Sequence, residues 1–275
     1  MSYVPEPPPA NPDIILQRKR ILRAVALRLD QGEIVGEDDD RDVGAVTHAR
    51  GLIDGQQVVY RLIYEDDGST KVFRTKASAP APRGFFLDVR RSGLAAQKEV
   101  EQGHARDMTF DDPLFDAAFI VDGAPERHVR ELLDIHVRQK LVLAGDVSLS
   151  TDGADPTGFR SIGQFVITAS EWIADPNRAH AMLQAVARLA LKARLIGEDG
   201  RQQHDALGSA GYREPANASG NGTSDEAGHG DAREIEMAVA RRKKRRQGRK
   251  LRALVIVGAL IGAVVLSAVF SHFLD

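Results

Sequence analysis

Three aspartates within six residues come closest to a catalytic or metal-binding pattern in this sequence. Asp111, Asp112 and Asp116 precede a short apolar run at 117–122 that indicates a strand. Clustered carboxylates can bind a hard cation or act as an acid–base pair. However, Asp112-Pro113 is also an ordinary opening of a turn. The pattern favours this structural role, and we assign no catalytic residue to it.

Two histidines lie on one expected helix, which Pro125 opens and which runs over 124–143. His136 coincides with its apolar stripe, one turn after Leu132, and His128 lies eight residues earlier. Zinc-binding histidines on a helix are usually three or four residues apart. We therefore expect His136 to be a hydrogen-bonded core residue, and we expect Glu131 and Asp134 to be solvent-exposed charges.

Composition excludes several function classes. The chain has 275 residues and no Cys, so disulfides, thiolate metal sites and a Cys nucleophile are ruled out. Phosphate-binding Gly-rich loops, the Gly-x-Ser-x-Gly elbow and the His-Glu-x-x-His motif are all missing. We expect no cofactor and no metal. The N-terminus lacks the basic and apolar regions of a signal peptide.

An uncharged apolar stretch at 253–274 is the strongest signal in the chain. About 20 helical residues cross a hydrocarbon core of about 30 Å, and inside lipid only a helix satisfies the backbone of one segment. The stretch therefore predicts a single transmembrane helix with the lipid bilayer as a partner. Gly258 and Gly262 form a Gly-x-x-x-Gly pair that could support a homodimer through the span, although such spacing also arises from ordinary composition.

A basic collar precedes this span. Its nine basic residues are Arg241, Arg242, Lys243, Lys244, Arg245, Arg246, Arg249, Lys250 and Arg252. The positive-inside rule places this side in the cytoplasm, at a bacterial inner membrane. The collar could act only as a topology determinant, or could also attract anionic lipid headgroups. The remaining chain carries a formal charge of −11, which argues against binding to nucleic acid.

The order of predicted elements indicates an α+β protein. An amphipathic helix over 13–30 comes first, and its basic face could lie on a membrane. An acidic loop at 37–40 follows. Asp54-Gly55 and Asp67-Gly68 then predict turns of an antiparallel β-meander of four strands, with a Pro-containing loop at 80–82 before the fourth strand at 84–90.

A β-α-β-β-α unit follows the meander, with strands at 117–122, 147–151 and 164–169 and a last helix at 176–196. The chain is predicted to have five parts. These are a Pro-rich N-terminus with helix and acidic loop (1–43), a soluble domain (44–197), a flexible linker (198–230), a basic juxtamembrane helix (231–252) and the transmembrane helix (253–274).

The segment from Phe110 to Val121 is similar to a sequence pattern found in other proteins. Its Asp-Pro-x-Phe-Asp-x-x-Phe-x-Val pattern, followed by a helix with Leu132-Leu133 and then two strands and a helix, resembles a group of uncharacterised bacterial domains associated with membranes. The resemblance covers about 45–196. It implies no activity and no catalytic residue.

These observations favour a membrane-tethered, cytosol-facing domain that binds or scaffolds an unknown protein partner. One alternative is an enzyme whose pocket gathers several of Asp111, Asp112, Asp116, His128 and His136. Another is an accessory subunit of a membrane complex, for which we expect a sizeable exposed apolar patch.

Overall fold

An eight-stranded antiparallel sheet forms the frame of the domain. The computed structural model describes residues 12–36, 47–66, 70–82, 85–152, 163–210, 235–238 and 240–241. The strands follow the order β1-β2-β3-β4-β8-β7-β5-β6 across the sheet. Their bounds are Asp30–Val35 (β1), His48–Ile53 (β2), Gln56–Asp66 (β3), Lys71–Ala81 (β4), Phe86–Arg91 (β5), Phe119–Ala124 (β6), Val147–Asp152 (β7) and Gly163–Ala169 (β8).

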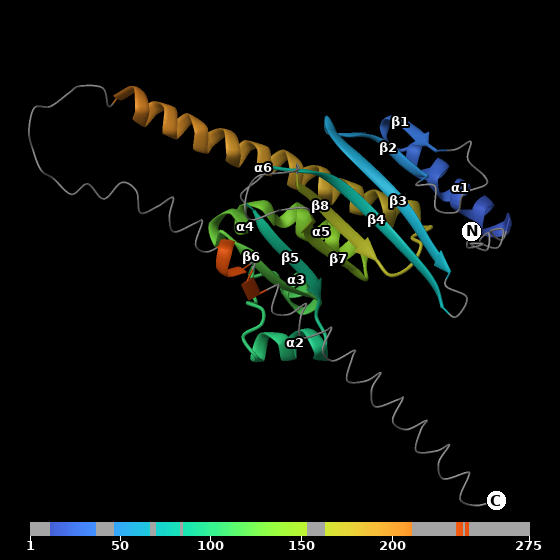
Figure 1. Cartoon of the computed structure of the whole chain (residues 1–275), viewed down its shortest axis with the longest axis horizontal. Helices are drawn as coiled ribbons and strands as arrows, with labels where there is room; N and C mark the ends of the chain where they lie inside the picture. Colours follow the sequence, from blue (N-terminus) through green and yellow to red (C-terminus); the bar gives the residue numbers. More distant parts are fainter. Residues whose placement is uncertain are drawn as a thin grey trace, which may run out of the picture.

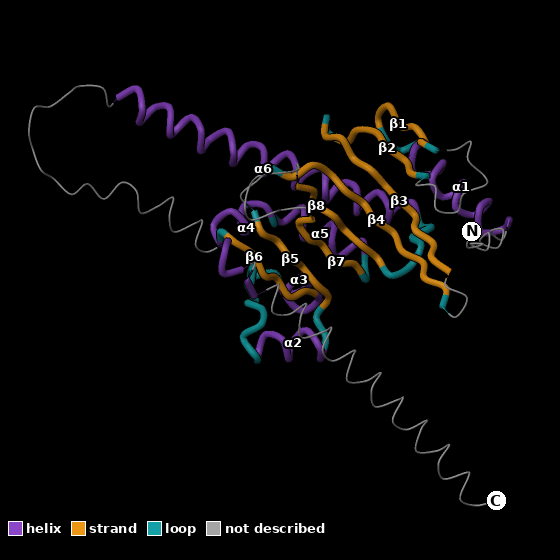
Figure 2. The backbone as a smooth tube through the Cα atoms, in the orientation of Figure 1, coloured by secondary structure: helices purple, strands orange, loops and turns teal. Residues whose placement is uncertain are grey.

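The larger helices cover one face of this sheet, so the domain has two main layers, while α2 (Leu94–Glu101) and the short helical segment near residue 238 contact the opposite face at β5 and β6 (Figures 1 and 2). The helices are Pro12–Ala26 (α1), Leu94–Glu101 (α2), Pro113–Ala118 (α3), Glu126–Leu132 (α4), Ile135–Ala144 (α5) and Pro176–Ala210 (α6). α6 packs against β3, β4 and β8, α1 packs against the edge formed by β1 and β2, and α5 packs along α6. The predicted α+β class is confirmed.

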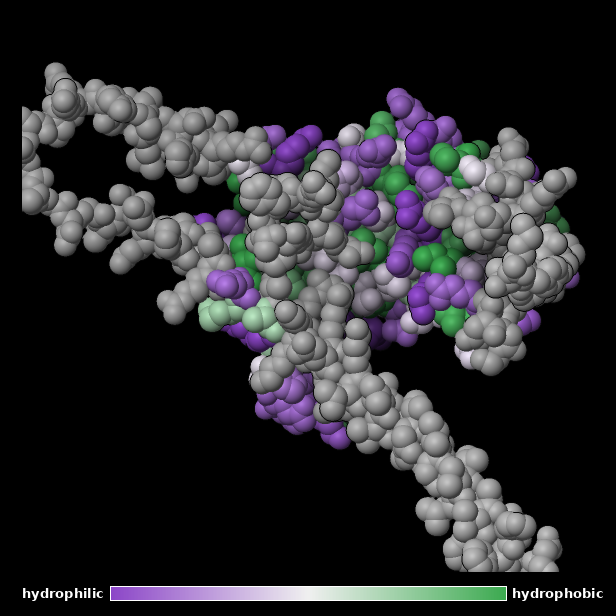
Figure 3. All heavy atoms as spheres, in the orientation of Figure 1, coloured by the Kyte–Doolittle hydropathy of each residue, from purple (hydrophilic) through white to green (hydrophobic). Residues whose placement is uncertain are grey.

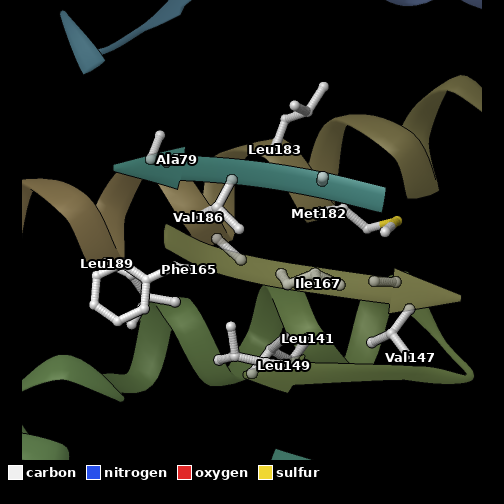
Figure 4. Packing of buried hydrophobic residues seen from close by; sticks show 14 of the residues in the cluster. Ala79, Leu141, Val147, Leu149, Phe165, Ile167, Met182, Leu183, Val186 and Leu189 are labelled. Carbon is white, nitrogen blue, oxygen red and sulfur yellow. The ribbon is translucent and has the colours of Figure 1, made fainter. Parts of the chain in front are cut away.

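The core lies between the sheet and α6. Alternate residues of β4, β7 and β8 point toward the apolar face of α6, and Figure 4 shows Ile167 and Leu149 below Val186 of this helix. Tyr60 is buried there, and its hydroxyl donates a hydrogen bond of 2.9 Å to the carbonyl of Ile173. Burial raises the pKa of Tyr60, so the phenol stays protonated and keeps its role as a donor.

The predicted β2–β3 hairpin is confirmed. Ile53 pairs with Gln56, so the loop has two residues, and both Asp54 and Gly55 have positive φ (50° and 71°). This is the backbone of a type I′ turn, which Asp-Gly favours. The predicted turn at Asp67-Gly68 lies outside the described residues.

The predicted four-strand meander is wrong in its last step. β2, β3 and β4 are neighbours, but β5 lies between β7 and β6, while β8 pairs with β4. Pro80, expected in a loop, lies within β4. The pairing between β3 and β4 ends at Ser78, so Pro80 has a partner strand only in β8, a position where the missing N–H is tolerated.

Several helix boundaries also differ from the predictions. α1 ends at Ala26 and β1 begins at Asp30, within the predicted helix 13–30. α6 continues to Ala210, so the first part of the predicted linker 198–230 is helical. α2 and α3 are additional short helices.

The predicted helix 124–143 is two helices. α4 ends at Leu132, and the side chain of Asp134 caps α5 by accepting a hydrogen bond of 2.9 Å from the N–H of Val137. Leu132, Leu133, Val137 and Leu141 are buried as predicted. His136, however, is exposed, because the break at Leu133 changes the helical phase and turns the first residues of α5 toward solvent.

The predicted transmembrane helix 253–274 lies outside the described residues. Among the helices within the described ranges, none is both long and apolar enough to cross a membrane.

Candidate functional site

Two of the three clustered aspartates shape the corner that leads into α3. Asp112 is the N-cap residue of α3, and its carboxylate accepts a hydrogen bond of 3.3 Å from the N–H of Phe115. The carboxylate of Asp116 accepts bonds of 3.1 Å and 3.2 Å from the N–H groups of Phe110 and Asp112. Asp111 is exposed at a left-handed backbone position (φ 55°). These roles match the structural interpretation of the pattern.

Arg138 of α5 joins this corner to the rest of the helical layer. Its Nε donates a hydrogen bond of 2.9 Å to Oδ2 of Asp112, and its Nη1 donates one of 2.8 Å to the carbonyl of Leu133. The guanidinium also lies 5.5 Å from the centre of the Phe110 ring. The hydrogen bond from Arg138 lowers the pKa of Asp112, so this carboxyl is held ionised rather than poised to exchange a proton.

Replacing Asp112 with Ala should lower the free energy of unfolding by about 2 kcal/mol, because both a helix cap and a partly buried charged hydrogen bond are lost. Urea unfolding of Asp112→Ala, Arg138→Ala and the double variant measures the coupling between the two side chains. We expect a coupling energy of about 1 kcal/mol. Strictly additive losses would show that the pair contributes nothing beyond its separate contacts.

The two histidines do not meet. His128 of α4 is half-buried, and its ring centre lies 5.7 Å from that of Phe85. The prediction that His136 belongs to the core is wrong, as its exposed position on α5 shows. Within the described parts of the chain, no group of three or more His, Asp or Glu side chains could hold a metal ion.

A set of charged side chains gathers instead on the outer face of β5 and β6, the face turned away from α6. Asp88 and Asp122 occupy directly paired positions on the two strands, and both are buried. Nε of Arg90 lies 3.4 Å from Oδ2 of Asp88, and the same guanidinium bonds to Glu99 of α2. We call this set, together with Phe86 and Ala124, the β5–β6 face.

Residues 235–241 close the β5–β6 face. Their described part is helical, and Ala238 is fully buried in a small apolar cluster with Phe86 and Ala124 (Figure 1, the short orange-red helix beside β6). Nη2 of Arg241 lies 3.2 Å from Oδ1 of Asp122. Sequence reasoning missed Asp88, Asp122 and the contact of Asp122 with Arg241, since a contact across 119 residues leaves no local pattern.

Arg241 is the one member of the predicted basic collar that falls within the described residues, and it lies against Asp122. The predicted lipid contacts of the collar stay predictions. The other residues for which we predicted contacts with lipid or with a second span lie outside the described ranges: Arg242, Lys243, Lys244, Arg245, Arg246, Arg249, Lys250, Arg252, Gly258 and Gly262.

Two shallow hollows lie away from all these groups. One, of about 450 Å³, is lined by residues of α1, β4 and the β8–α6 loop, including Phe73 and Trp172. The other, of about 460 Å³, lies between α1 and β1. Neither gathers the aspartates and histidines expected of the enzyme alternative. On the face shown in Figure 3, polar and apolar side chains of the described residues are interspersed.

The chain matches no protein-family model, no curated protein and no solved structure in comparisons with known proteins. The resemblance to an uncharacterised bacterial domain group therefore stays a prediction.

Proposed function

We propose that this protein is a single-pass membrane protein that presents an α+β binding domain on the cytoplasmic side of a bacterial inner membrane. The observation that carries the proposal is the uncharged apolar stretch 253–274, which follows nine basic residues directly. A stretch of this length suits a transmembrane helix, and the basic side of such a helix stays in the cytoplasm.

The roles of the polar side chains favour binding over catalysis. Asp112 and Asp116 hold backbone N–H groups, and Asp134 caps a helix. By contrast, part of the sheet face opposite α6 offers polar groups to a partner. Arg61, Lys76 and Thr168 occupy paired positions on β3, β4 and β8, and each is at least partly exposed. This row supports a role in recognising a partner molecule.

Deleting residues 253–275 should move the protein from the membrane fraction to the soluble fraction, because the proposed span is removed. Vesicle flotation and extraction with alkaline carbonate measure the change, and circular dichroism checks that the domain stays folded. The full chain should resist extraction. A truncated protein that still floats with vesicles would overturn the proposal that 253–274 alone anchors the chain. Deleting 241–275 then removes the collar as well, and a chain that still floats after this deletion would direct attention to the basic face of α1.

The binding role needs its own test. Detergent-solubilised full-length protein and the chain lacking 253–275 are used as parallel baits, and bound proteins are identified by mass spectrometry. A partner captured by both baits but lost when Arg61 and Lys76 are changed to Glu would support recognition through the open sheet face. Capture of no partner by either bait would contradict the binding role.

A further inference from the structure

The docked segment 235–241 packs on the domain although it lies far along the chain from the elements that it contacts. Residues 211–234 separate it from the end of α6 at Ala210. Even so, Ala238 is buried to 0% exposure, against Phe86 and Ala124. A side chain larger than Ala would have to displace its neighbours at such a position, so the contact is sterically specific.

Charge complementarity strengthens the same contact. Asp122 has 0% exposed surface and lies opposite the second buried carboxylate, Asp88. Arg90 shares its guanidinium between Asp88 and Glu99 on the same face. Buried carboxylates are costly unless they are paired. Arg241 supplies a cation at Asp122, 3.2 Å away.

We propose that this contact sets how far the domain stands from the membrane and which side it turns toward the bilayer. The inference rests on the proposed span at 253–274. Eleven residues, 242–252, lie between the docked segment and that span, and they reach at most about 40 Å. Without the contact, the forty-two residues of 211–252 would join α6 to the span and could reach about 150 Å.

The position of the contact also defines an orientation. β6 is the last strand of the sheet and β1 is the first, so the docked segment lies at one end of the sheet and α1 at the other (Figure 1). α2 follows β5 and is tied to it through Arg90 and Glu99. The β6 edge and α2 therefore lie nearest the bilayer, and α1 with β1 lies farthest from it.

Energy transfer from a labelled side chain to acceptor lipids tests both statements on the full-length protein in phosphatidylcholine vesicles. The chain has no cysteine, so single labels can be introduced cleanly. Leu94→Cys on α2 (80% exposed) reports the near end, and Leu27→Cys beside α1 (87% exposed) reports the far end. We expect stronger transfer from position 94 than from position 27.

Arg241→Gln should lower transfer from position 94 about twofold and reduce the difference between the two labels, because the tether becomes longer. Arg194→Gln removes the same charge from an exposed position of α6 (side chain 56% exposed) and is the matched control, with transfer expected to be unchanged. Ala238→Gln keeps every charge but cannot be buried in the same space, and should act like Arg241→Gln. Unchanged transfer in both docking variants would overturn the proposal.

Two further measurements distinguish failure of the proposed membrane anchor from failure of the proposed docking within one chain. Flotation of each labelled protein with the vesicles reports the anchor, so loss of flotation in the parent chain indicates that the proposed function itself has failed. Oxidation of the Ala124→Cys, Ala238→Cys double variant should give a cross-link within one chain, seen by gel electrophoresis. Cross-linked dimers as the main product would show that the segment docks on a second copy, and would overturn docking within the chain.

Discussion

Phe115→Ala should lower the free energy of unfolding by about 3–5 kcal/mol, the cost of removing a large aromatic side chain from a packed core. Phe115 has 0% exposed surface. Its ring centre lies 5.6 Å from that of Phe110 and 5.2 Å from that of Phe119. α3 has only six residues, and Phe115 is its one buried residue. Loss of this ring therefore removes the main contact that holds the helix on the domain.

The neighbouring Leu114 is the matched control, since it belongs to the same helix but is 76% exposed. Leu114→Ala should change the free energy of unfolding by less than about 0.5 kcal/mol. Urea unfolding followed by circular dichroism measures both variants. Equal losses for the two variants would contradict the assignment of Phe115 as the residue that holds α3 in place.

Local patterns in the sequence predicted the parts of the fold that depend on short-range chemistry. Asp54-Gly55 predicted the β2–β3 turn, because few dipeptides accept two successive positive φ angles. The strands predicted at 147–151 and 164–169 lie within one residue of the bounds of β7 and β8. The start of the last helix was also predicted correctly at Pro176, although not its length.

The order of strands could not be predicted in this way. β5 follows β4 in the chain but pairs with β6 and β7, and β8 is the strand that lies beside β4. This arrangement depends on pairing between strands that lie far apart in the chain, and alternation within one strand does not specify its neighbours. Pro80 misled the prediction for a related reason, since its place in β4 is tolerated only because the pairing with β3 has already ended.

In the candidate site, too, local contacts could be predicted from the sequence and long-range contacts could not. The capping role of Asp112 was predictable, because Asp-Pro before an apolar residue is a local signal. The β5–β6 face was not predictable, because it joins Asp88, Asp122 and Arg241 from three distant segments. Arg241 stands among nine basic residues in sequence, and nothing local distinguishes it from the others.

Asp134 offers the second large effect, and it corrects the prediction that this residue is a solvent-exposed charge. Besides capping α5, its carboxylate lies 2.7 Å from Nη2 of Arg188 and 3.1 Å from Nζ of Lys192, both on α6. Asp134→Ala removes the cap and both ion pairs, and should lower the free energy of unfolding by about 2–3 kcal/mol. Glu131→Ala, at an exposed position of α4, is the matched control and should have little effect.

Asp134→Asn separates the two contributions, because Asn is also a good N-cap residue but carries no charge. Burial raises the pKa of Asp134, but hydrogen bonds from Arg188, the N–H of Val137 and Lys192 outweigh burial and lower the pKa to about 2. The pKa of Asp134 is lower in the folded state than in the unfolded state. Its ionised carboxylate therefore stabilises the fold at pH values above the unfolded pKa, near 3.8. This stabilisation is lost as the pH falls through about 2.

The stability difference between the parent protein and Asp134→Asn should therefore be constant from neutral pH down to about pH 5, and should shrink between about pH 4 and pH 2. Asp134→Ala should keep part of its deficit over the same range, because protonation leaves an oxygen that can still cap α5. Urea unfolding of the three proteins at several pH values gives the comparison. A difference for Asp134→Asn that stays constant down to pH 2 would show that the ion pairs with α6 do not stabilise the fold, and that Asp134 acts through the cap alone.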